Sequence, residues 1–275
     1  MTTERVSRVT VMMPCYNNAA FIEEAVESVL GQSDLPPHVE LELLIVDDGS
    51  RDDSVALIES MNDGRIRLVQ NEHNRGISRV RNQLLQLASG DLVSSLDGDD
   101  FYFDERKLSR EWKILEASRN PDRTIVYSDI RWVDEQGAEM LDASSLAPPM
   151  EGILFQGLLD RRVMVPRDFL MSTQLARSVG GFDESLPIYE DWDYKLRLAQ
   201  KAFFQFTHYT GIGYRRHGMG LSSVKSSLHR RCLTKIRRKH GLSGFDGDAM
   251  QILDHTGRVQ SILAGNRLRQ RTKAA

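Results

Sequence analysis

The sequence has few of the features that mark secreted, membrane-spanning or zinc-binding proteins. Its 275 residues include two cysteines, Cys15 and Cys232, which are too few and too far apart for a disulfide framework or a zinc site. No apolar run approaches the roughly 18 residues needed to span a bilayer. Residues 1–8 are polar and charged, unlike a signal peptide. These absences predict a cytoplasmic protein in a reducing compartment.

A large excess of charge of one sign is also missing. The chain has 36 Lys and Arg against 39 Asp and Glu, a formal net charge of -3. Because no basic field covers the whole molecule, we expect no nucleic-acid partner. Hydrophobic residues make up 40% of the chain, enough to form the core of one large domain.

The glycine motifs that bind phosphates are absent as well. The first apolar segment, residues 9–13, runs into Pro14-Cys15-Tyr16-Asn17-Asn18 and not into Gly-x-Gly-x-x-Gly, and no Gly-x4-Gly-Lys-Ser/Thr occurs. A dinucleotide-binding protein or a Walker-type NTPase is therefore not expected. A diphosphate site in this chain would need a cation in place of a glycine loop.

The order of the apolar segments predicts an α/β fold with a mainly parallel central sheet. Four short apolar segments, residues 9–13, 41–46, 66–69 and 91–96, have the length and composition of buried strands. The segments between them have helical periodicity. Strands that alternate with helices form βαβ units, whose strands run parallel.

Polar clusters follow three of these strands. They are Pro14 to Asn17, Asp47-Asp48, and Asp97-Gly98-Asp99-Asp100. Taken alone, the third cluster is either an acidic turn or a site for a divalent cation, which prefers carboxylate oxygens. Since ligands bind beyond the carboxyl ends of parallel strands, we expect the three clusters to converge, and this favours the cation.

The second half of the chain has a weaker pattern. We expect a helix at residues 103–118, strands at 124–128 and 203–209, a loop-rich stretch at 140–157 and an extended segment at 167–174. A further helix begins near Glu190, with Asp193 on its solvent side. No linker divides residues 1–222, so they form one domain, followed at 223–275 by a basic, mostly helical C-terminal extension.

Residues 215–240 contain nine Lys or Arg and no Asp or Glu. Leu228, Leu233 and Ile236 are interleaved with them. Three interpretations stay open: a helix that makes peripheral contact with an anionic membrane surface, a solvated tail, or a contact between subunits.

Six motifs in the chain, in this order, resemble those of the family 2 glycosyltransferases of GT-A fold. They are Pro14-x-Tyr16-Asn17, Val46-Asp47-Asp48-Gly49-Ser50, Asn74-Arg75-Gly76 with Arg81-Asn82, Leu96-Asp97-Gly98-Asp99-Asp100, Gly181-Phe182-Asp183-Glu184 and Glu190-Asp191. The resemblance implies a Rossmann-like GT-A domain with a donor-binding half at about 1–101 and an acceptor-side half at about 102–222. It also implies inverting transfer of a sugar from a nucleotide diphosphate donor, with Mn²⁺ or Mg²⁺.

The resemblance and the side-chain chemistry together predict the donor site. An ionised Asp47 only accepts hydrogen bonds, so it matches the N3–H of uracil, although Asp47 or Asp48 is equally able to cap a turn. Tyr16 is placed to stack on the base. Arg81 either contacts the donor or forms a structural salt bridge with the acidic edge. The residues predicted to bind the nucleotide sugar are Pro14, Tyr16, Asn17, Asp47, Arg75, Arg81, Asp97 and Gly98.

The metal prediction rests on Asp97-x-Asp99. In an extended segment these two side chains would share a side and Asp100, whose role is open, would point elsewhere. The resemblance implies that Asp99 is a direct metal ligand and that Asp97 contacts ribose or metal-bound water. His217, in Tyr214-Arg215-Arg216-His217, is the predicted further ligand or diphosphate contact.

Asp191 is the predicted catalytic base, with Glu190 as its neighbour at the reaction centre. Inverting transfer needs one carboxylate that takes the proton of the acceptor hydroxyl. The alternative is that both are acids favoured by the dipole at a helix start. The leading hypothesis is a UDP-sugar-dependent transferase acting on a glycan or lipid-linked glycan in cell-surface polysaccharide synthesis. The others are a sugar-phosphate nucleotidyltransferase and a non-catalytic nucleotide-sugar-binding protein.

Overall fold

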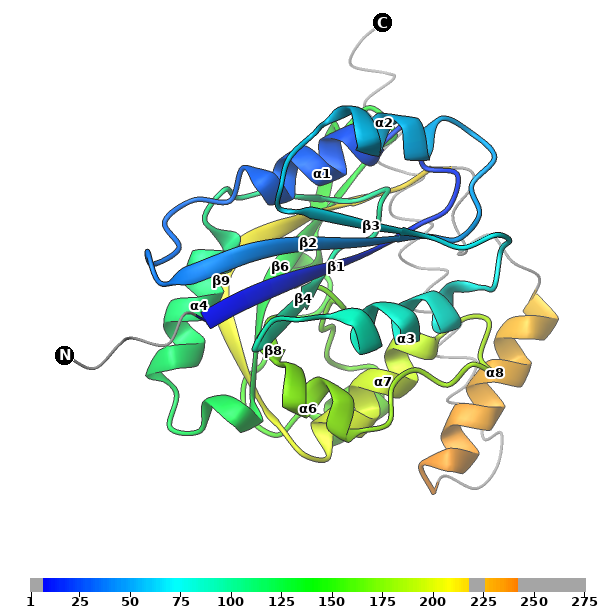
Figure 1. Ribbon diagram of the computed structural model, residues 1–275. Coiled ribbons are helices and arrows are strands. Elements are labelled where there is room, and N and C mark those ends of the chain that lie inside the picture. The colour runs from blue at the N-terminus through cyan, green and yellow to red at the C-terminus, as the bar shows by residue number, and fades with distance from the viewer. Residues whose placement is uncertain (1–6, 218–225, 242–275) are drawn as a thin grey trace, which may run out of the picture.

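The computed structural model describes residues 7–217 and 226–241, which form two sheets flanked by helices (Figure 1). The larger sheet has the strand order β3-β2-β1-β4-β8. Its first four strands are parallel and β8 is antiparallel to β4. Their bounds are Ser7–Cys15 (β1), Val39–Asp47 (β2), Ile66–Gln70 (β3), Leu92–Ser95 (β4) and Met171–Ser172 (β8). The predicted mainly parallel α/β sheet is confirmed.

Alternation along the strands divides the core into two layers. Val9, Val11 and Met13 of β1 are buried in the cluster that includes the apolar side of α1, whereas Met12 is buried with the inner side of α3. Successive side chains of a strand point to opposite faces, so a continuous apolar run fills both layers. Figure 1 shows α1 and α2 on one face of the sheet and α3 on the other. The bounds are Ile22–Leu30 (α1), Ser54–Ser60 (α2) and Ile77–Leu87 (α3).

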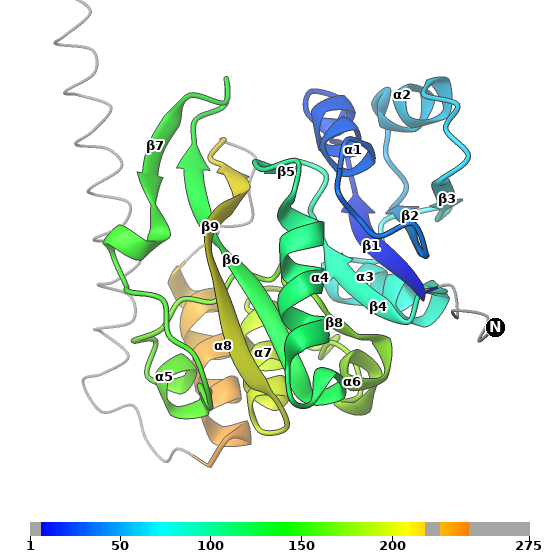
Figure 2. The same ribbon diagram turned by 90° about the vertical axis from the view of Figure 1, so that its left-hand side faces the viewer.

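The second sheet has the order β5-β9-β6-β7 and lies beside α4 (Figure 2). Its elements are Phe101–Tyr102 (β5), Lys107–Ala117 (α4), Thr124–Val133 (β6), Glu139–Asp142 (β7) and Phe203–Arg215 (β9). Strands β6 and β9 continue past the predicted ends at 128 and 209. Their pairing shifts register between Tyr127 and Asp129, and such a bulge interrupts the alternation that the prediction relied on.

Residues 140–178 contain short elements that the sequence did not reveal. In addition to β8 they are Ala143–Ser145 (η2, a 3-10 turn), Phe155–Leu159 (α5) and Thr173–Ser178 (α6). Another 3-10 turn, Pro121–Arg123 (η1), lies earlier in the chain, before β6. The loop at 140–157 and the extended segment at 167–174 were therefore wrong in part. Elements of two to six residues are too short to show a period.

The last two helices are α7 (Glu190–Ala199) and α8 (Ser226–Lys239), which lie side by side (Figures 1 and 2). Asp193 of α7 is fully buried and its Oδ2 is 2.9 Å from Nζ of Lys239. The predicted exposure of Asp193 is wrong because α8 covers this side of α7.

Helix α8 also buries the apolar residues of the basic stretch. Leu233 and Ile236 have no exposed surface, and they pack in the same core layer as α3 and α7. The interpretation as a solvated tail is thus wrong for residues 226–239. Contact of its basic side with a membrane or a second subunit stays a prediction. The part of the extension beyond 241 lies outside the described residues, and within the described ones no helix has the length and apolar character of a membrane span.

Candidate active site

The polar clusters that follow β1, β2 and β4 meet at one edge of the sheet. Pro14 to Asn18, Asp48 and Asp97 to Asp99 line a single cavity of about 630 Å³, together with Arg75 and His217. We call it the strand-end cavity. The predicted convergence of the three clusters is confirmed, and it follows from the parallel direction of the three strands.

Asp47 and Asp48 are both bound to backbone amides. Asp47 is 2% exposed and accepts hydrogen bonds from the N–H groups of Gly49, at 3.1 Å, and Ser50, at 3.0 Å. Asp48 accepts from the N–H groups of Arg75 and Gly76, both at 2.9 Å. The turn-capping alternative therefore describes Asp47, whereas Asp48 binds the distant segment that leads into α3. Asp47 lines a neighbouring cavity of about 350 Å³ with Tyr16, so its contact with a base stays a prediction.

The acidic cluster is a turn in which three carboxylates converge. The N–H of Asp100 donates to the carbonyl of Asp97 at 3.0 Å, and oxygens of Asp97, Asp99 and Asp100 lie within 4.8 Å of one another. The expectation that Asp100 points elsewhere is wrong because the segment is not extended. Burial and the charge of Asp99 raise the pKa of Asp100 well above its usual value.

Two buried groups hold Asp100 in place. Its Oδ1 accepts a hydrogen bond from the backbone N–H of Arg215 at 2.9 Å, and its Oδ2 accepts one from Arg167 at 2.7 Å. The same Nη2 of Arg167 is 2.6 Å from Asp97. Arg167 offsets the like charges of the turn, and it was missed because no pattern in residues 140–174 marked it.

Arg81 joins the acidic turn to the start of α7. It is 6% exposed, with Nη1 2.6 Å from Glu190 and Nη2 2.9 Å from Asp97. This is the salt-bridge alternative. Arg81 does not line the strand-end cavity, and its contact with a nucleotide sugar stays a prediction.

Asp99 and His217 form the candidate metal site. Nε2 of His217 is 2.8 Å from Oδ2 of Asp99, and both side chains face the strand-end cavity. The hydrogen bond to Asp99 raises the pKa of His217. A carboxylate beside an imidazole, with two further carboxylates within 4.8 Å, is a donor set that fits Mn²⁺ or Mg²⁺.

Glu190 and Asp191 open α7 and line a second cavity of about 320 Å³, which we call the helix-start cavity. Asp97, Asp99 and His217 line both cavities. The predicted base and the predicted metal ligands therefore share one space, although Asp99 comes from the donor-binding half and Asp191 and His217 from the acceptor-side half.

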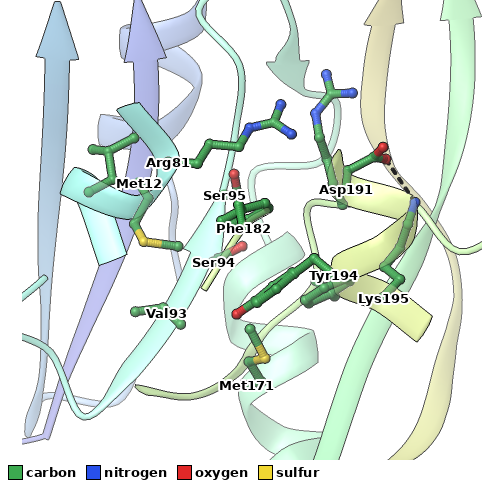
Figure 3. A pocket seen from close by; sticks show the side chains of 13 residues that line it. Met12, Arg81, Val93, Ser94, Ser95, Met171, Phe182, Asp191, Tyr194 and Lys195 are labelled. Carbon is green, nitrogen blue, oxygen red and sulfur yellow. Dashed lines mark hydrogen bonds and ion pairs between the residues drawn. The ribbon is translucent and has the colours of Figure 1, made fainter. Parts of the chain in front are cut away.

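Lys195 holds the carboxylate of Asp191 (Figure 3). Its Nζ is 3.0 Å from Oδ2 of Asp191 and donates to the carbonyl of Val165 at 2.9 Å. Burial raises the pKa of Asp191, but the charges of Lys195, Arg81 and Arg167 outweigh it and keep the pKa well below its usual value. Asp191 is thus ionised at neutral pH. Lys195 was missed by sequence reasoning, although its i,i+4 spacing from Asp191 is a signal that could have found it.

Beneath Asp191 and Arg81 the site is apolar. Figure 3 shows Phe182 and Tyr194 together with apolar side chains of the strands, and the rings of Phe182 and Tyr194 stack with centroids 4.2 Å apart. The carboxylate of Asp191 is directed toward Lys195 in Figure 3, and Asp191 also lines the helix-start cavity together with Asp97 and Asp99.

A parallel sheet with an aspartate turn at its edge and an ionised carboxylate across the cavity defines a glycosyltransferase of the GT-A fold. The family model for glycosyl transferase family 2 matches residues 10–177, and the chain belongs to this family.

Solved structures support the fold. Residues 1–349 of S. aureus TarS superpose with a TM-score of 0.66 at 19% identity, covering 90% of this chain and 70% of that one. The same TarS segment in complex with UDP-GlcNAc gives a TM-score of 0.66 at 20% identity.

Curated relatives include uncharacterized and polysaccharide-forming proteins. MT1568 of Mycobacterium tuberculosis, an uncharacterized protein, is 28% identical over 81% of this chain and 71% of its own length. Chondroitin synthase of Escherichia coli is 28% identical over 83% of this chain, and hyaluronan synthase of Pasteurella multocida is 26% identical over 92%. The chain spans only 32% and 25% of these two synthases.

Proposed function

We propose that the protein is an inverting, metal-dependent glycosyltransferase that moves a sugar from a UDP-sugar to a hydroxyl of a glycan or lipid-linked glycan. One observation carries the proposal: the strand-end and helix-start cavities meet at Asp97, Asp99 and His217, and the ionised Asp191 faces the second of them. A donor and an acceptor can therefore occupy adjoining spaces.

The strand-end cavity is proposed to hold the donor. Its volume of about 630 Å³ falls in the range of small-molecule sites. Tyr16, which is 42% exposed, borders both this cavity and the one lined by Asp47, so a base lying over Tyr16 would reach Asp47. The choice of uridine is also supported by one structural neighbour, since residues 1–349 of TarS have been solved in complex with UDP-GlcNAc.

Asp99 and His217 are proposed to hold Mn²⁺ or Mg²⁺. A bound divalent cation would neutralise charge on the diphosphate as it leaves. The chain itself offers positive groups to the same region, because Arg75 lines the strand-end cavity and Arg216 lines the helix-start cavity.

Asp191 is proposed to accept the proton of the acceptor hydroxyl. The hydroxyl oxygen forms a bond to the anomeric carbon as the bond from that carbon to the diphosphate oxygen breaks. The electron pair leaves with the diphosphate, and attack from the opposite face inverts the configuration. The transition state resembles an oxocarbenium ion, as in glycoside hydrolysis.

Two variants separate the roles of the carboxylates. Asp191→Asn should bind UDP-sugar like the wild type and lose transfer, whereas Asp99→Ala should lose the Mn²⁺-dependent part of donor binding. Thermal shift with UDP-sugars, with and without Mn²⁺, measures binding, and UDP release measures transfer. Asp122→Asn, at an exposed position in η1, is the control.

The opposite results would contradict each assignment. If Asp99→Ala and wild type bound the donor with equal Mn²⁺-dependent affinity, Asp99 would not be a metal ligand. If Asp191→Asn turned over at the full rate, Asp191 would not be the catalytic base. Donor binding with no transfer to any acceptor favours the non-catalytic binding protein. Release of pyrophosphate from a nucleoside triphosphate and a sugar phosphate favours the nucleotidyltransferase.

A further inference from the structure

Arg161 occupies the turn after α5 and lines the helix-start cavity. Its backbone is in the left-handed region, with φ 55°, where a residue with a long side chain is uncommon. The N–H of Arg161 donates to the carbonyl of Leu158 at 3.2 Å, so the turn is closed by hydrogen bonding. The backbone gains nothing from arginine here, and the reason for it must lie in the side chain.

Two aromatic rings at the start of α7, one from Tyr189 just before the helix and one from Trp192 within it, contact the guanidinium. Cζ of Arg161 is 5.2 Å from the ring centroid of Tyr189 and 5.0 Å from that of Trp192. The rings are themselves anchored: Nε1 of Trp192 donates to Leu158 at 2.9 Å, and the hydroxyl of Tyr189 is 2.9 Å from Nδ1 of His229. Cation–π contacts use no N–H donor of the guanidinium as a conventional hydrogen bond would, so they leave those donors available.

Among the residues that the structure describes, the guanidinium of Arg161 makes these two ring contacts and no ion pair, and its Nη1 has no hydrogen-bond partner. A buried donor without an acceptor costs about 1–3 kcal/mol, so such groups are normally satisfied by a water, an ion or a ligand. A guanidinium held between two rings and lacking a carboxylate partner is suited to bind an anion.

The other arginines whose ion pairs are resolved around this cavity already have carboxylate partners. Arg81 is paired with Glu190 and Asp97, Arg167 with Asp97 and Asp100, and Arg215 with Glu24.

The position of Arg161 points to the acceptor. It lines the helix-start cavity with Asp191 but does not line the strand-end cavity proposed for the donor. Its two ring contacts, Tyr189 and Trp192, flank Glu190-Asp191 in the sequence. A molecule that brings a hydroxyl to Asp191 in this space lies beside the guanidinium.

We propose that Arg161 binds an anionic group of the acceptor, a carboxylate or a phosphate, close to the hydroxyl that receives the sugar. The acceptor class is then an anionic saccharide, such as one that contains a uronate or a phosphosugar. This inference rests on the proposed function, and it names the substrate class of the same site.

The test measures anion binding to the whole protein with Mn²⁺ and saturating UDP present. The probes are glucuronate with glucose as its uncharged counterpart, and glycerol 3-phosphate with glycerol, each titrated by calorimetry or ligand-observed NMR. Wild type should bind at least one anion more tightly than its uncharged counterpart. Arg161→Gln should weaken that binding about tenfold, the usual scale for one charge-assisted hydrogen bond. If Arg161→Gln binds glucuronate more weakly, the group bound by Arg161 is a carboxylate. If it binds glycerol 3-phosphate more weakly, the group is a phosphate.

The neighbouring residue supplies a matched control. Arg162 has a side chain that is 74% exposed and pairs with Asp160, so Arg162→Gln removes the same charge one residue away and should bind the anions like wild type. Arg161→Asn suits the left-handed backbone and serves as a second variant if Arg161→Gln unfolds.

Two results overturn the inference: equal anion binding by wild type and Arg161→Gln, or displacement of UDP by either anion from the wild type. Binding of UDP and UDP-sugar to the same wild-type sample tests the proposed function separately. The anion titration is also repeated without UDP, so that anion binding is measured even if the protein binds no UDP.

Discussion

Lys195 lies one helical turn after Asp191 on α7, and its ammonium group is 3.0 Å from the carboxylate of Asp191. Because the same ammonium also donates to the carbonyl of Val165, the lysine cannot swing away without leaving that carbonyl unpaired. The pair holds the carboxylate in one position and keeps it ionised. A carboxylate with a low pKa is ionised at neutral pH but is a weak base. Much of the catalysis must therefore come from the position in which it is held relative to the substrate.

Lys195→Met should change the pH dependence of UDP-sugar turnover. The variant removes the charge that lowers the pKa of Asp191 most, while burial, which raises it, remains. The pKa of Asp191 should rise, and the acid limb of the pH–rate profile should move to higher pH, so the variant should lose activity before wild type as the pH is lowered. Lys201→Met, an exposed lysine just after α7, is the control. Superimposable profiles would show that Lys195 does not act on the base.

Arg81→Gln should unfold more easily than wild type by about 3–5 kcal/mol, because it leaves the buried carboxylate of Glu190 without its arginine, whereas Asp97 keeps Arg167. The matched surface pair is Arg79 with Glu184, in which the Arg79 side chain is 54% exposed. Arg79→Gln should cost less than about 1 kcal/mol. Urea unfolding measures the stability of both variants. If Arg81→Gln lost no more stability than Arg79→Gln, the buried Arg81 bridges would contribute no more than an exposed ion pair.

Lys107 and Glu111 form a fully buried ion pair on α4, with Nζ 2.8 Å from Oε2. Lys107→Met should destabilise the protein by about 3–5 kcal/mol, since Ser128 would be the one side-chain donor left to the buried Glu111 among the described residues. Lys107→Met combined with Glu111→Gln should recover much of that loss. A double-mutant cycle by chemical unfolding checks this, and strictly additive losses would contradict the coupling.

Asp168→Asn should stabilise the protein at neutral pH and not at low pH. Burial raises the pKa of Asp168 from 3.8 to about 6, and its Oδ1 has no hydrogen-bond partner among the described residues. The folded state therefore binds more protons than the unfolded state between these pH values, and stability falls as pH rises through that window. Removing the charge should restore about 1–3 kcal/mol above pH 6 and nothing below about pH 4.

Unfolding of Asp168→Asn and wild type is compared from pH 4 to 7, with the exposed Asp122→Asn as the control. A gain that does not vary with pH would reject this explanation.

Local patterns were enough to predict the strands of the parallel sheet and the edge at which the site lies. A short apolar run and the polar residues that follow it are close in sequence, so a strand and its end can be predicted locally. Because the strands are parallel, their C-terminal ends then lie together at one edge of the sheet. The bridge from Arg81 to the acidic edge was one of two open alternatives, but the partners of the other buried charges were not predictable in this way. Arg167 reaches Asp97 and Asp100 from a segment with no period, and Asp193 is buried only because α8 covers it. Such contacts depend on tertiary packing, which propensity does not encode.

The connectivity of the sheet also bears on how the chain is made. Strands β1 to β4 lie within residues 7–95, but β4 gains its outer neighbour only when β8, Met171–Ser172, has been synthesised. Until Arg167 arrives, the carboxylates of Asp97 and Asp100 lack the arginine that they share. Domains emerge from the ribosome N-terminus first, so a nascent chain carries an unbalanced acidic turn and an open sheet edge for much of its synthesis. The reaction centre is complete only when nearly the whole domain has left the ribosome, and prematurely terminated chains have no means of assembling it.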